Sequence, residues 1–419
     1  MSDEDEMFYA PHDSLEGLLQ RGRGLGALRA AQDPAAAAPY VYDGIRRDWR
    51  WDGIDERSLY LARLVRDLEL SPTPVVAQLE GDEYACLRAT RVLELLALSG
   101  SGEALDGLRD HIREGEHWVD VLESVADLWP ADWWEDLGEV ARARMGGEAE
   151  PPWRREPWIR FGIGTRDVPD RPRRGLDGHS DEELLSLLAD TRAGDRAKAD
   201  ALRELAGRPA TEELIPLVPL LPASPGGRPL APLRRAVERL GARAVPAARG
   251  WAADGREWLA ELGVDVLADH GEPEALPFLL RRLADQWEGR AWCGPGTTAS
   301  RLARFGSAAT EAVPVLRRYW LRNPHSSERP GYLEALAAID PSGLDHAHTE
   351  SLRDCEQLAR ALGVAHAPDV PEVREWVAAL CDDPMEEPEV RAAAAERTDG
   401  FRAQGDPERP RRSRRPCGT

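Results

Sequence analysis

The sequence predicts an all-α fold in which short helical hairpins stack into a solenoid. The clearest helix lies between 256 and 269, where apolar residues recur at i, i+3, i+7 and i+8. These residues are Leu259, Leu262, Val266 and Leu267. Because this spacing places them on one side of a helix, that side is expected to be buried.

A recurring proline is the second observation. Four prolines follow apolar residues and precede another apolar run, at intervals of 30, 31 and 37 residues: Pro216, Pro246, Pro277 and Pro314. Since the first turn of a helix leaves its N–H groups unpaired, a helix can begin at proline without loss. Such a period holds two helices of about 12 residues, and each pair must stack on its neighbours to cover its apolar face.

The residues around these prolines resemble the HEAT repeat family. The runs LGARAVPAAR (240–249) and FGSAATEAVPVL (305–316) are similar to the junction and first helix of such a repeat, and DDPMEEPEVRAAA (382–394) is similar to its turn and second helix. The resemblance covers 195–397, and the N-terminal half resembles actinobacterial HEAT-repeat proteins more loosely. It implies a right-handed stack of hairpins with a concave face that holds other macromolecules, and it implies no reaction.

The charge of the chain disfavours two classes of partner. The 75 acidic residues outnumber the 54 basic ones, which gives a net charge of −21, and Lys198 is the one lysine. Such a surface repels nucleic acid and anionic membranes. Between 51 and 150 there are 23 Asp and Glu against 9 Arg. This acidity is interpreted either as solvated helix faces or as an acidic groove for a basic segment of a partner.

Composition also predicts the compartment. The five cysteines lie far apart, which indicates neither a disulfide framework nor a zinc ribbon. The acidic start of the chain is unlike a secretory signal, and no run approaches 18 apolar residues. A cytoplasmic protein is therefore expected, and the abundance of Arg, Ala, Gly and Pro suggests a bacterial source with GC-rich DNA.

Five segments are predicted from these patterns. They are an N-terminal helix with an irregular segment (1–54), divergent acidic helical repeats (55–145), a linker or insertion rich in Pro, Gly and Arg (146–179), HEAT-like repeats (180–401) and a disordered Arg-rich tail (402–419). The linker is interpreted either as mobile or as held against the acidic half by Trp153 and Trp158.

Helix signals define the elements of these segments. One helix is expected over 13–31, with Asp13 as N-cap and Glu16 as its capping-box partner, before the Ala- and Pro-rich run 33–39 breaks it. Further helices are expected over 55–69, 74–80, 83–98, 103–113, 117–128 and 132–145. Asp177 or Ser180, followed by Glu183, is expected to open the next helical region.

Tryptophans are the candidate partner-binding residues. They are Trp118, Trp133, Trp134, Trp287 and Trp292. The last two lie in the run 286–300, which interrupts the repeats, and longer loops of solenoids often gather on the binding face. The other interpretation of all five is core packing, because tryptophan is highly buried on average.

No catalytic residue, cofactor or metal is predicted. The sequence has no phosphate-binding loop, nucleophile elbow or zinc-protease motif. His346 and His348 with Asp345 are the nearest approach to a metal site, but residues two apart do not share a helix face.

Two functions stay open at this point. The first is a non-catalytic scaffold that binds a protein, with a few aromatic and Arg anchors. The second comes from the resemblance: HEAT-like alkylpurine DNA glycosylases act on duplex DNA, which would require a basic concave stripe despite the net charge of −21. No motif in the sequence supports a resemblance to HEAT-like bilin lyases. The sequence makes no prediction of the oligomeric state.

Overall fold

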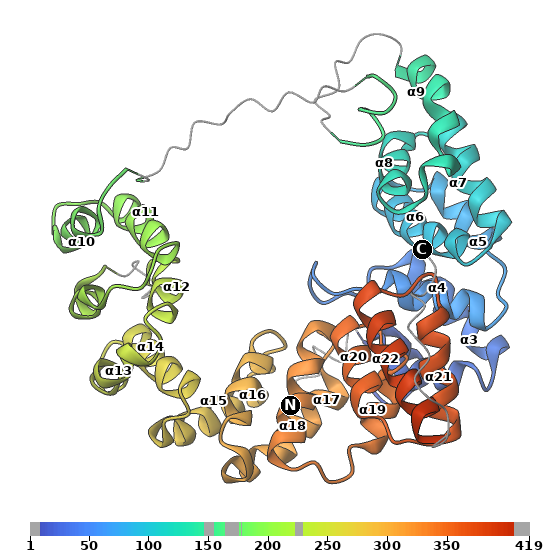
Figure 1. Cartoon of the computed structure of the whole chain (residues 1–419). Coiled ribbons are helices and arrows are strands. Elements are labelled where there is room, and N and C mark those ends of the chain that lie inside the picture. Colours follow the sequence, from blue (N-terminus) through green and yellow to red (C-terminus); the bar gives the residue numbers. More distant parts are fainter. Residues whose placement is uncertain (1–8, 146–154, 164–175, 177, 223–228, 406–419) are drawn as a thin grey trace. The chain divides into compact units, whose positions relative to one another are not determined.

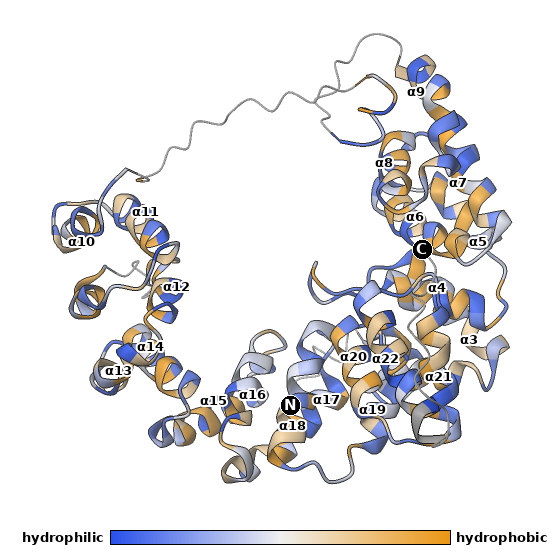
Figure 2. Cartoon of the chain, viewed as in Figure 1, coloured by the Kyte–Doolittle hydropathy of each residue, from blue (hydrophilic) through white to orange (hydrophobic). Residues whose placement is uncertain are grey.

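The computed structural model describes residues 9–145, 155–163, 176, 178–222 and 229–405 (Figure 1). The regular elements of these residues are helices, and none is a β-strand, which confirms the all-α prediction. Helices adjacent in sequence pack in pairs, as α6 (Glu83–Leu98) does with α7 (Gly102–Glu114). Figure 2 shows hydrophobic and hydrophilic residues alternating along the helices, as burial of one side requires.

The chain divides into two compact units. Unit 1 comprises Met1–Val168, Arg318–Leu333 and Ser342–Thr419, and unit 2 comprises Pro169–Arg317 and Glu334–Pro341. Within the described residues, every helix is too short or too polar to span a lipid bilayer.

The first part of unit 1 differs from the sequence prediction at its start. Its other helices are α1 (Leu15–Gln20), α2 (Gly24–Ala30), α3 (Pro34–Arg46), α4 (Ser58–Asp67), α5 (Thr73–Val76), η1 (Ala77–Glu80), α8 (Trp118–Leu128), η2 (Ala131–Trp133), η3 (Glu135–Leu137) and α9 (Gly138–Met145). The single helix expected over 13–31 is wrong, because the chain turns at Gly22, whose φ is +64°. The N-cap is Ser14 and not Asp13, since the Ser14 hydroxyl accepts from the Gly17 N–H.

The predicted break at 33–39 is also wrong. Asp33 accepts a hydrogen bond from the Ala36 N–H and Pro34 occupies the first helical position, so this run begins α3. Alanine then favours helix through the following turn. The helix predicted over 83–98 is confirmed as α6, whereas the one predicted over 132–145 is replaced by η2, η3 and the shorter α9.

Unit 2 contains residues 180–317 and 334–341 of the HEAT-like repeats predicted over 180–401, and the rest of that range belongs to unit 1. Its elements are α10 (Asp181–Ala189), α11 (Asp195–Ala206), η4 (Glu212–Leu220), α12 (Leu233–Glu238), η5 (Gly241–Ala244), α13 (Val245–Ala252), α14 (Glu257–Asp269), η6 (Pro273–Ala275), α15 (Leu276–Glu288), α16 (Pro295–Ala303) and η7 (Gly306–Ala312). The capping box of Ser180 and Glu183 is confirmed. Pro246 and Pro277 lie in the first turns of α13 and α15, but Pro216 lies inside η4.

The predicted buried face of α14 is confirmed. Leu259, Leu262, Val266 and Leu267 are between 1% and 7% exposed. The helix is also buried beyond this face, at Trp258, Gly263 and Val264 among others.

The chain passes between the units within α17 (Val313–Arg322) and α18 (Arg329–Ile339). Unit 1 is then completed by η8 (Ser326–Glu328), α19 (Asp345–Ser351), α20 (Gln357–His366), α21 (Pro371–Asp382) and α22 (Pro388–Gly405). Helix α22 continues past residue 402, where the tail was predicted to begin, and residues 406–419 lie outside the described residues.

Unit 1 is closed by contacts between its N-terminal and C-terminal segments. The core cluster of the N-terminal helices includes Cys355 and Met385 from the far end of the chain. The Arg23 guanidinium donates to the carbonyl oxygens of Trp320 and Leu321 at 3.1 and 3.0 Å, and it also pairs with Glu350. Neighbouring glycines permit this approach.

Two glycines in the run RGRGLG allow the backbone of residues 22–24 to reach the C-terminal segment. The Cys355 N–H donates to the Gly22 carbonyl oxygen at 2.9 Å. A β-carbon on Gly24 would lie 1.7 Å from the Glu350 carbonyl oxygen, so no larger residue fits there. The contact between the two segments of unit 1 therefore depends on the charge of Arg23 and on the absence of side chains at Gly22 and Gly24.

A second buried junction lies at Asp55, which is 0% exposed. Its carboxylate lies 2.8 Å from His325 Nδ1 and accepts a hydrogen bond from the Ser326 hydroxyl at 2.8 Å. Burial alone would raise the pKa of Asp55, but the Arg57 guanidinium and these hydrogen bonds lower it to about 2. A buried carboxylate is thus held ionised where segments some 270 residues apart meet.

Candidate functional site

Three of the five candidate tryptophans belong to an aromatic cluster in unit 1. Trp118 and Trp134 are 9% and 2% exposed, and Trp133 is half-buried. The ring centroids of Trp118 and Trp158 lie 6.1 Å apart, and those of Trp129 and Trp133 lie 5.6 Å apart. Edge-to-face contacts of this kind stabilise a core, so the side chains of Trp118 and Trp134 pack mainly against their own chain.

The other two candidates, Trp287 and Trp292, lie at the end of α15 and just after it. Both are half-buried, and their rings meet at 6.1 Å with an interplanar angle of 82°. These two residues and Trp133 keep part of the indole at the surface. Contact of these residues with a partner stays a prediction.

The described part of the predicted linker is packed against unit 1. Trp158 is 0% exposed, and its Nε1 donates to Glu123 at 2.6 Å. The Arg142 guanidinium donates to the Phe161 carbonyl oxygen at 2.7 Å. Residues 155–163 are therefore held in place, which agrees with the second of the two interpretations of the linker as far as Trp158 is concerned, whereas Trp153 lies outside the described residues.

A pocket lined by arginines is the candidate site that the sequence did not predict. It lies in unit 1 between α6 and the end of α3 with the loop that follows, and its volume is about 240 Å³. Its charged lining residues are Arg47, Arg50, Arg57, Arg88, Arg91 and Asp48, a formal balance of +4. We call this the arginine pocket. In a chain of net charge −21 it is a local reversal of sign.

Local contacts hold these arginines in place. Arg88 donates to the carbonyl oxygens of Ile45 and Arg46, at 3.2 and 2.6 Å, and so satisfies the end of α3. Arg50 binds Asp48 through two nitrogens at 2.6 and 2.8 Å, and this hydrogen bonding lowers the pKa of Asp48. Arg91 pairs with Glu94 at 3.1 Å, while burial raises the pKa of Glu94.

Two of the arginines form no direct ion pair, although Arg57 lies near enough to Asp55 to lower the pKa of that carboxyl. Arg88 binds backbone carbonyls, and Arg57 donates to the Ser326 hydroxyl and the Cys355 sulfur at 2.8 and 2.9 Å. Among the described residues, neither has a carboxylate at ion-pair distance. The pocket is therefore suited to an anionic group, which a guanidinium binds through charge-assisted hydrogen bonds.

Exposed apolar side chains lie close to the pocket in sequence. Trp51 and Ile54, in the loop that supplies Arg50, are 43% and 66% exposed. Tyr84, one turn before Arg88 on α6, is 72% exposed. Residues four apart share a helix face, so Tyr84 lies on the side of α6 that carries Arg88.

Sequence reasoning missed the pocket because its arginines come from two separated segments. The segment 47–57 carries Arg47, Arg50 and Arg57, and the helix predicted over 83–98 carries the i, i+3 pair of Arg88 and Arg91. The pairing of these segments was the missing information. The net negative charge of 51–150 gave no indication that some of its arginines form a local basic site.

His348, the central residue of the weak metal candidate, is buried on α19. Its ring centroid lies 5.3 Å from that of His366, and burial together with His366 lowers the pKa of His348 to about 4. His346 on the same helix is exposed. The two histidines therefore face different surroundings, as their spacing predicted.

Searches of protein-family models, of curated proteins and of solved structures find no match to this chain. Fold and site thus define a class: an all-α protein of paired helices with an arginine-lined pocket in an acidic chain. The resemblance to HEAT repeats stays a prediction.

Proposed function

We propose that this chain is a non-catalytic scaffold of HEAT-like helical repeats that binds a partner protein, and that the arginine pocket anchors an acidic segment of that partner. The observation that carries the proposal is the pocket itself, which is lined by five arginines and one aspartate; exposed Trp51 and Tyr84 lie near these residues in sequence. Arg, Trp and Tyr are the residue types that contribute most to binding at protein interfaces.

The size of the pocket favours a ligand that inserts single side chains, such as a protein segment, and disfavours a ligand with a flat surface. A volume of about 240 Å³ takes one or two carboxylate side chains, while the exposed rings of Trp51 and Tyr84, on the loop and helix that supply its arginines, offer apolar contact. Helical repeats commonly present such extended binding surfaces. The acidity of 51–150 leads to the opposite prediction, that the partner segment is basic. The experiment described next distinguishes these two predictions.

The test measures binding of fluorescent decaglutamate and decalysine to the full chain by anisotropy. Decaglutamate is expected to bind, and Arg47→Glu with Arg50→Glu is expected to weaken it at least about tenfold, because charge reversal replaces attraction by repulsion. Both arginines are exposed, so the fold is expected to survive. The matched control reverses Arg192 and Arg196, which are exposed in unit 2.

The natural partner is then sought by affinity capture from the host with the same three proteins. A protein lost with the pocket variant, retained with the control and released by salt would support the proposal. Decalysine binding alone, or equal capture by all three proteins, would contradict it. Co-purified DNA in place of a protein would favour the glycosylase-like alternative.

A further inference from the structure

Tyr9, the first described residue, packs against the wall of the arginine pocket. Its hydroxyl donates to the Trp49 carbonyl oxygen at 2.9 Å, and the centroids of the two rings lie 5.8 Å apart. Trp49 lines the pocket together with its neighbours in sequence, Asp48 and Arg50. The residues that precede Tyr9 are therefore joined to the structure next to this pocket.

Several contacts fix Tyr9 in this position. Its side chain is 9% exposed, and the Arg21 guanidinium lies 5.1 Å from the centre of its ring. Burial raises the pKa of Tyr9 to about 12, so its hydroxyl stays protonated at neutral pH and continues to donate to Trp49. The next residue is also held, because the Ala10 N–H donates to Gln20 at 2.7 Å. The starting point of the preceding segment is thus well defined.

The residues before Tyr9 carry the charge opposite to that of the pocket. Residues 3–6 are Asp, Glu, Asp and Glu, and residues 1–8 contain no Lys or Arg, so their side chains have a formal charge of −4. The charged residues that line the arginine pocket have a formal balance of +4. A guanidinium binds a carboxylate through charge-assisted hydrogen bonds. We call residues 3–6 the N-terminal acidic segment.

The N-terminal acidic segment is long enough to reach the arginines of the pocket. An extended chain spans at most about 3.6 Å per residue, so Glu6 is at most about 11 Å from Tyr9, and Asp3 at most about 22 Å. Arg47 and Arg50 are exposed, so carboxylates can approach them from the solvent. Both the length and the charge of the segment therefore suit the pocket.

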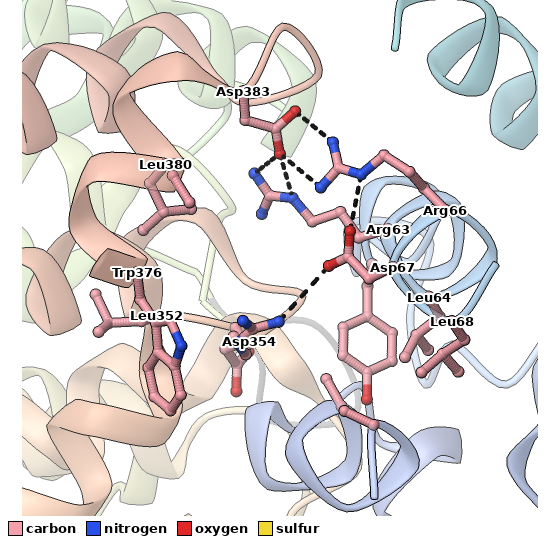
Figure 3. A pocket seen from close by; sticks show the side chains of 15 residues that line it. Arg63, Leu64, Arg66, Asp67, Leu68, Leu352, Asp354, Trp376, Leu380 and Asp383 are labelled. Carbon is pink, nitrogen blue, oxygen red and sulfur yellow. Dashed lines mark hydrogen bonds and ion pairs between the residues drawn. The ribbon is translucent and has the colours of Figure 1, made fainter. Parts of the chain in front are cut away.

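A second pocket of unit 1, between α4 and α21, also has arginines in its lining, but they are paired with aspartates (Figure 3). Arg63 donates to Asp383 at 2.9 Å, and Arg66 donates to Asp383 and Asp67 at 2.9 and 2.8 Å. With three arginines and three aspartates, this lining has a formal charge of zero. An acidic segment is therefore expected to prefer the arginine pocket.

We propose that the N-terminal acidic segment binds in the arginine pocket of its own chain and competes there with the acidic segment of a partner. A tethered segment has an effective concentration in roughly the millimolar range, so even weak intramolecular binding occupies the pocket. A partner then binds by displacing it. The competition rests on the function proposed for the pocket, whereas the intramolecular docking does not.

Proteolysis tests the docking without any added ligand. A protease that cleaves after glutamate removes the N-terminal acidic segment by cutting after Glu6, and intact-mass spectrometry follows the product. Docking protects this bond, so Arg47→Glu with Arg50→Glu is expected to accelerate the cut at least about threefold, as the undocked population rises. The control that reverses Arg192 and Arg196 in unit 2 is expected to keep the rate of the unaltered chain.

Decaglutamate binding tests the competition. The neutralised variant carries Asp3→Asn, Glu4→Gln, Asp5→Asn and Glu6→Gln. It is expected to bind labelled decaglutamate at least about threefold more tightly than the unaltered chain, because no tethered segment has to be displaced.

A matched control makes the same change in net charge elsewhere in unit 1. It carries Glu114→Gln, Glu116→Gln, Asp132→Asn and Glu139→Gln, at exposed positions that do not line the pocket. At 0.15 M salt, exposed charges are largely screened beyond about 8 Å, so this control is expected to bind decaglutamate as the unaltered chain does.

The two tests distinguish failure of the docking from failure of the proposed function. Equal cleavage of the unaltered chain and the pocket variant would overturn the docking, whatever decaglutamate does. Accelerated cleavage without any decaglutamate binding would support the docking and contradict the function proposed for the pocket. Equal decaglutamate affinity of the neutralised variant and the unaltered chain would overturn the competition. Circular dichroism checks the fold of each variant, and Arg47→Gln with Arg50→Gln, which removes charge without reversing it, is expected to accelerate the cut as well.

Discussion

Buried arginines in unit 1 each bind several groups at once. Arg23, Arg329 and Arg360 are at most 1% exposed. Arg360, for example, binds Glu386 at 2.8 Å and also donates to the carbonyl oxygens of Asp354 and Cys355. A guanidinium has five N–H donors in a fixed fork, so it can satisfy a carboxylate and the backbone together. Removal of either partner from such a pair is expected to cost about 3–5 kcal/mol.

His348→Gln tests the pH dependence that a buried histidine causes. The pKa of His348 is about 4 in the folded chain, against 6.5 when unperturbed. As the pH falls below 6.5 the unfolded state takes up the proton first, so the free energy of unfolding decreases until the pH reaches the folded pKa. The variant is expected to remove up to about 3 kcal/mol of this decrease between pH 7 and pH 4.

Urea unfolding at a series of pH values measures this difference. The control is His346→Gln, an exposed histidine on the same helix, which is expected to keep the pH dependence of the unaltered chain. Parallel curves for all three proteins would show that His348 does not titrate differently in the folded state.

Among the elements of unit 2, α13 and α14 pack backbone against backbone at Gly263. A β-carbon on Gly263 would lie 2.4 Å from the Ala252 backbone nitrogen and 2.7 Å from the Ala248 carbonyl oxygen. Neighbouring backbone cannot move aside as a flexible side chain can. Glycine lowers the intrinsic stability of α14, but it is required here because a β-carbon would prevent the close packing of the two helices.

Gly263→Ala is expected to destabilise unit 2 by about 1–3 kcal/mol, because overpacking outweighs the gain in helix propensity. Gly250→Ala on α13 is the matched control: no atom lies within 4 Å of its added β-carbon, and it is expected to stabilise by up to about 1 kcal/mol. Thermal unfolding of both variants gives the comparison. Stabilisation by both would refute the tight contact.

For the molecule as a whole, the central feature is that unit 1 is made from both ends of the sequence. In a linear solenoid each repeat contacts only its neighbours. Here Arg23 and Asp55 contact residues between 320 and 350 within the same unit. Neither end of the chain can satisfy its buried charges alone.

Fragments 1–168 and 318–419 are therefore expected to associate when mixed, with a gain in helicity and a common unfolding transition. Each fragment alone is expected to unfold without cooperativity, since an unpaired buried charge is costly. Gly24→Ala in the first fragment is expected to prevent association, because its β-carbon would lie 1.7 Å from the Glu350 carbonyl oxygen.

Circular dichroism and analytical ultracentrifugation measure both outcomes. The control is Gly102→Ala at the start of α7, where no atom lies within 4 Å of the added β-carbon. If fragment 1–168 folds cooperatively by itself and does not bind fragment 318–419, the conclusion that unit 1 requires both segments is wrong.

Local signals in the sequence determined a large part of the helical structure. The face of α14, the capping box at Ser180 and the bounds of α6 follow from spacing and caps, which depend on residues a few positions apart. Mistakes arose where two local signals competed. At 33–39, for example, the prolines suggested a break, but Asp33 and Pro34 together begin a helix.

Tertiary structure alone decided which distant residues meet. The arginine pocket joins 44–61 to 87–92, and the RGRGLG run binds residues about 300 positions away in the sequence. Helical periodicity specifies which face is buried but not the partner that covers it. That choice follows from the packing and hydrogen bonding of the whole unit, in which buried arginines must find carboxylates and backbone oxygens.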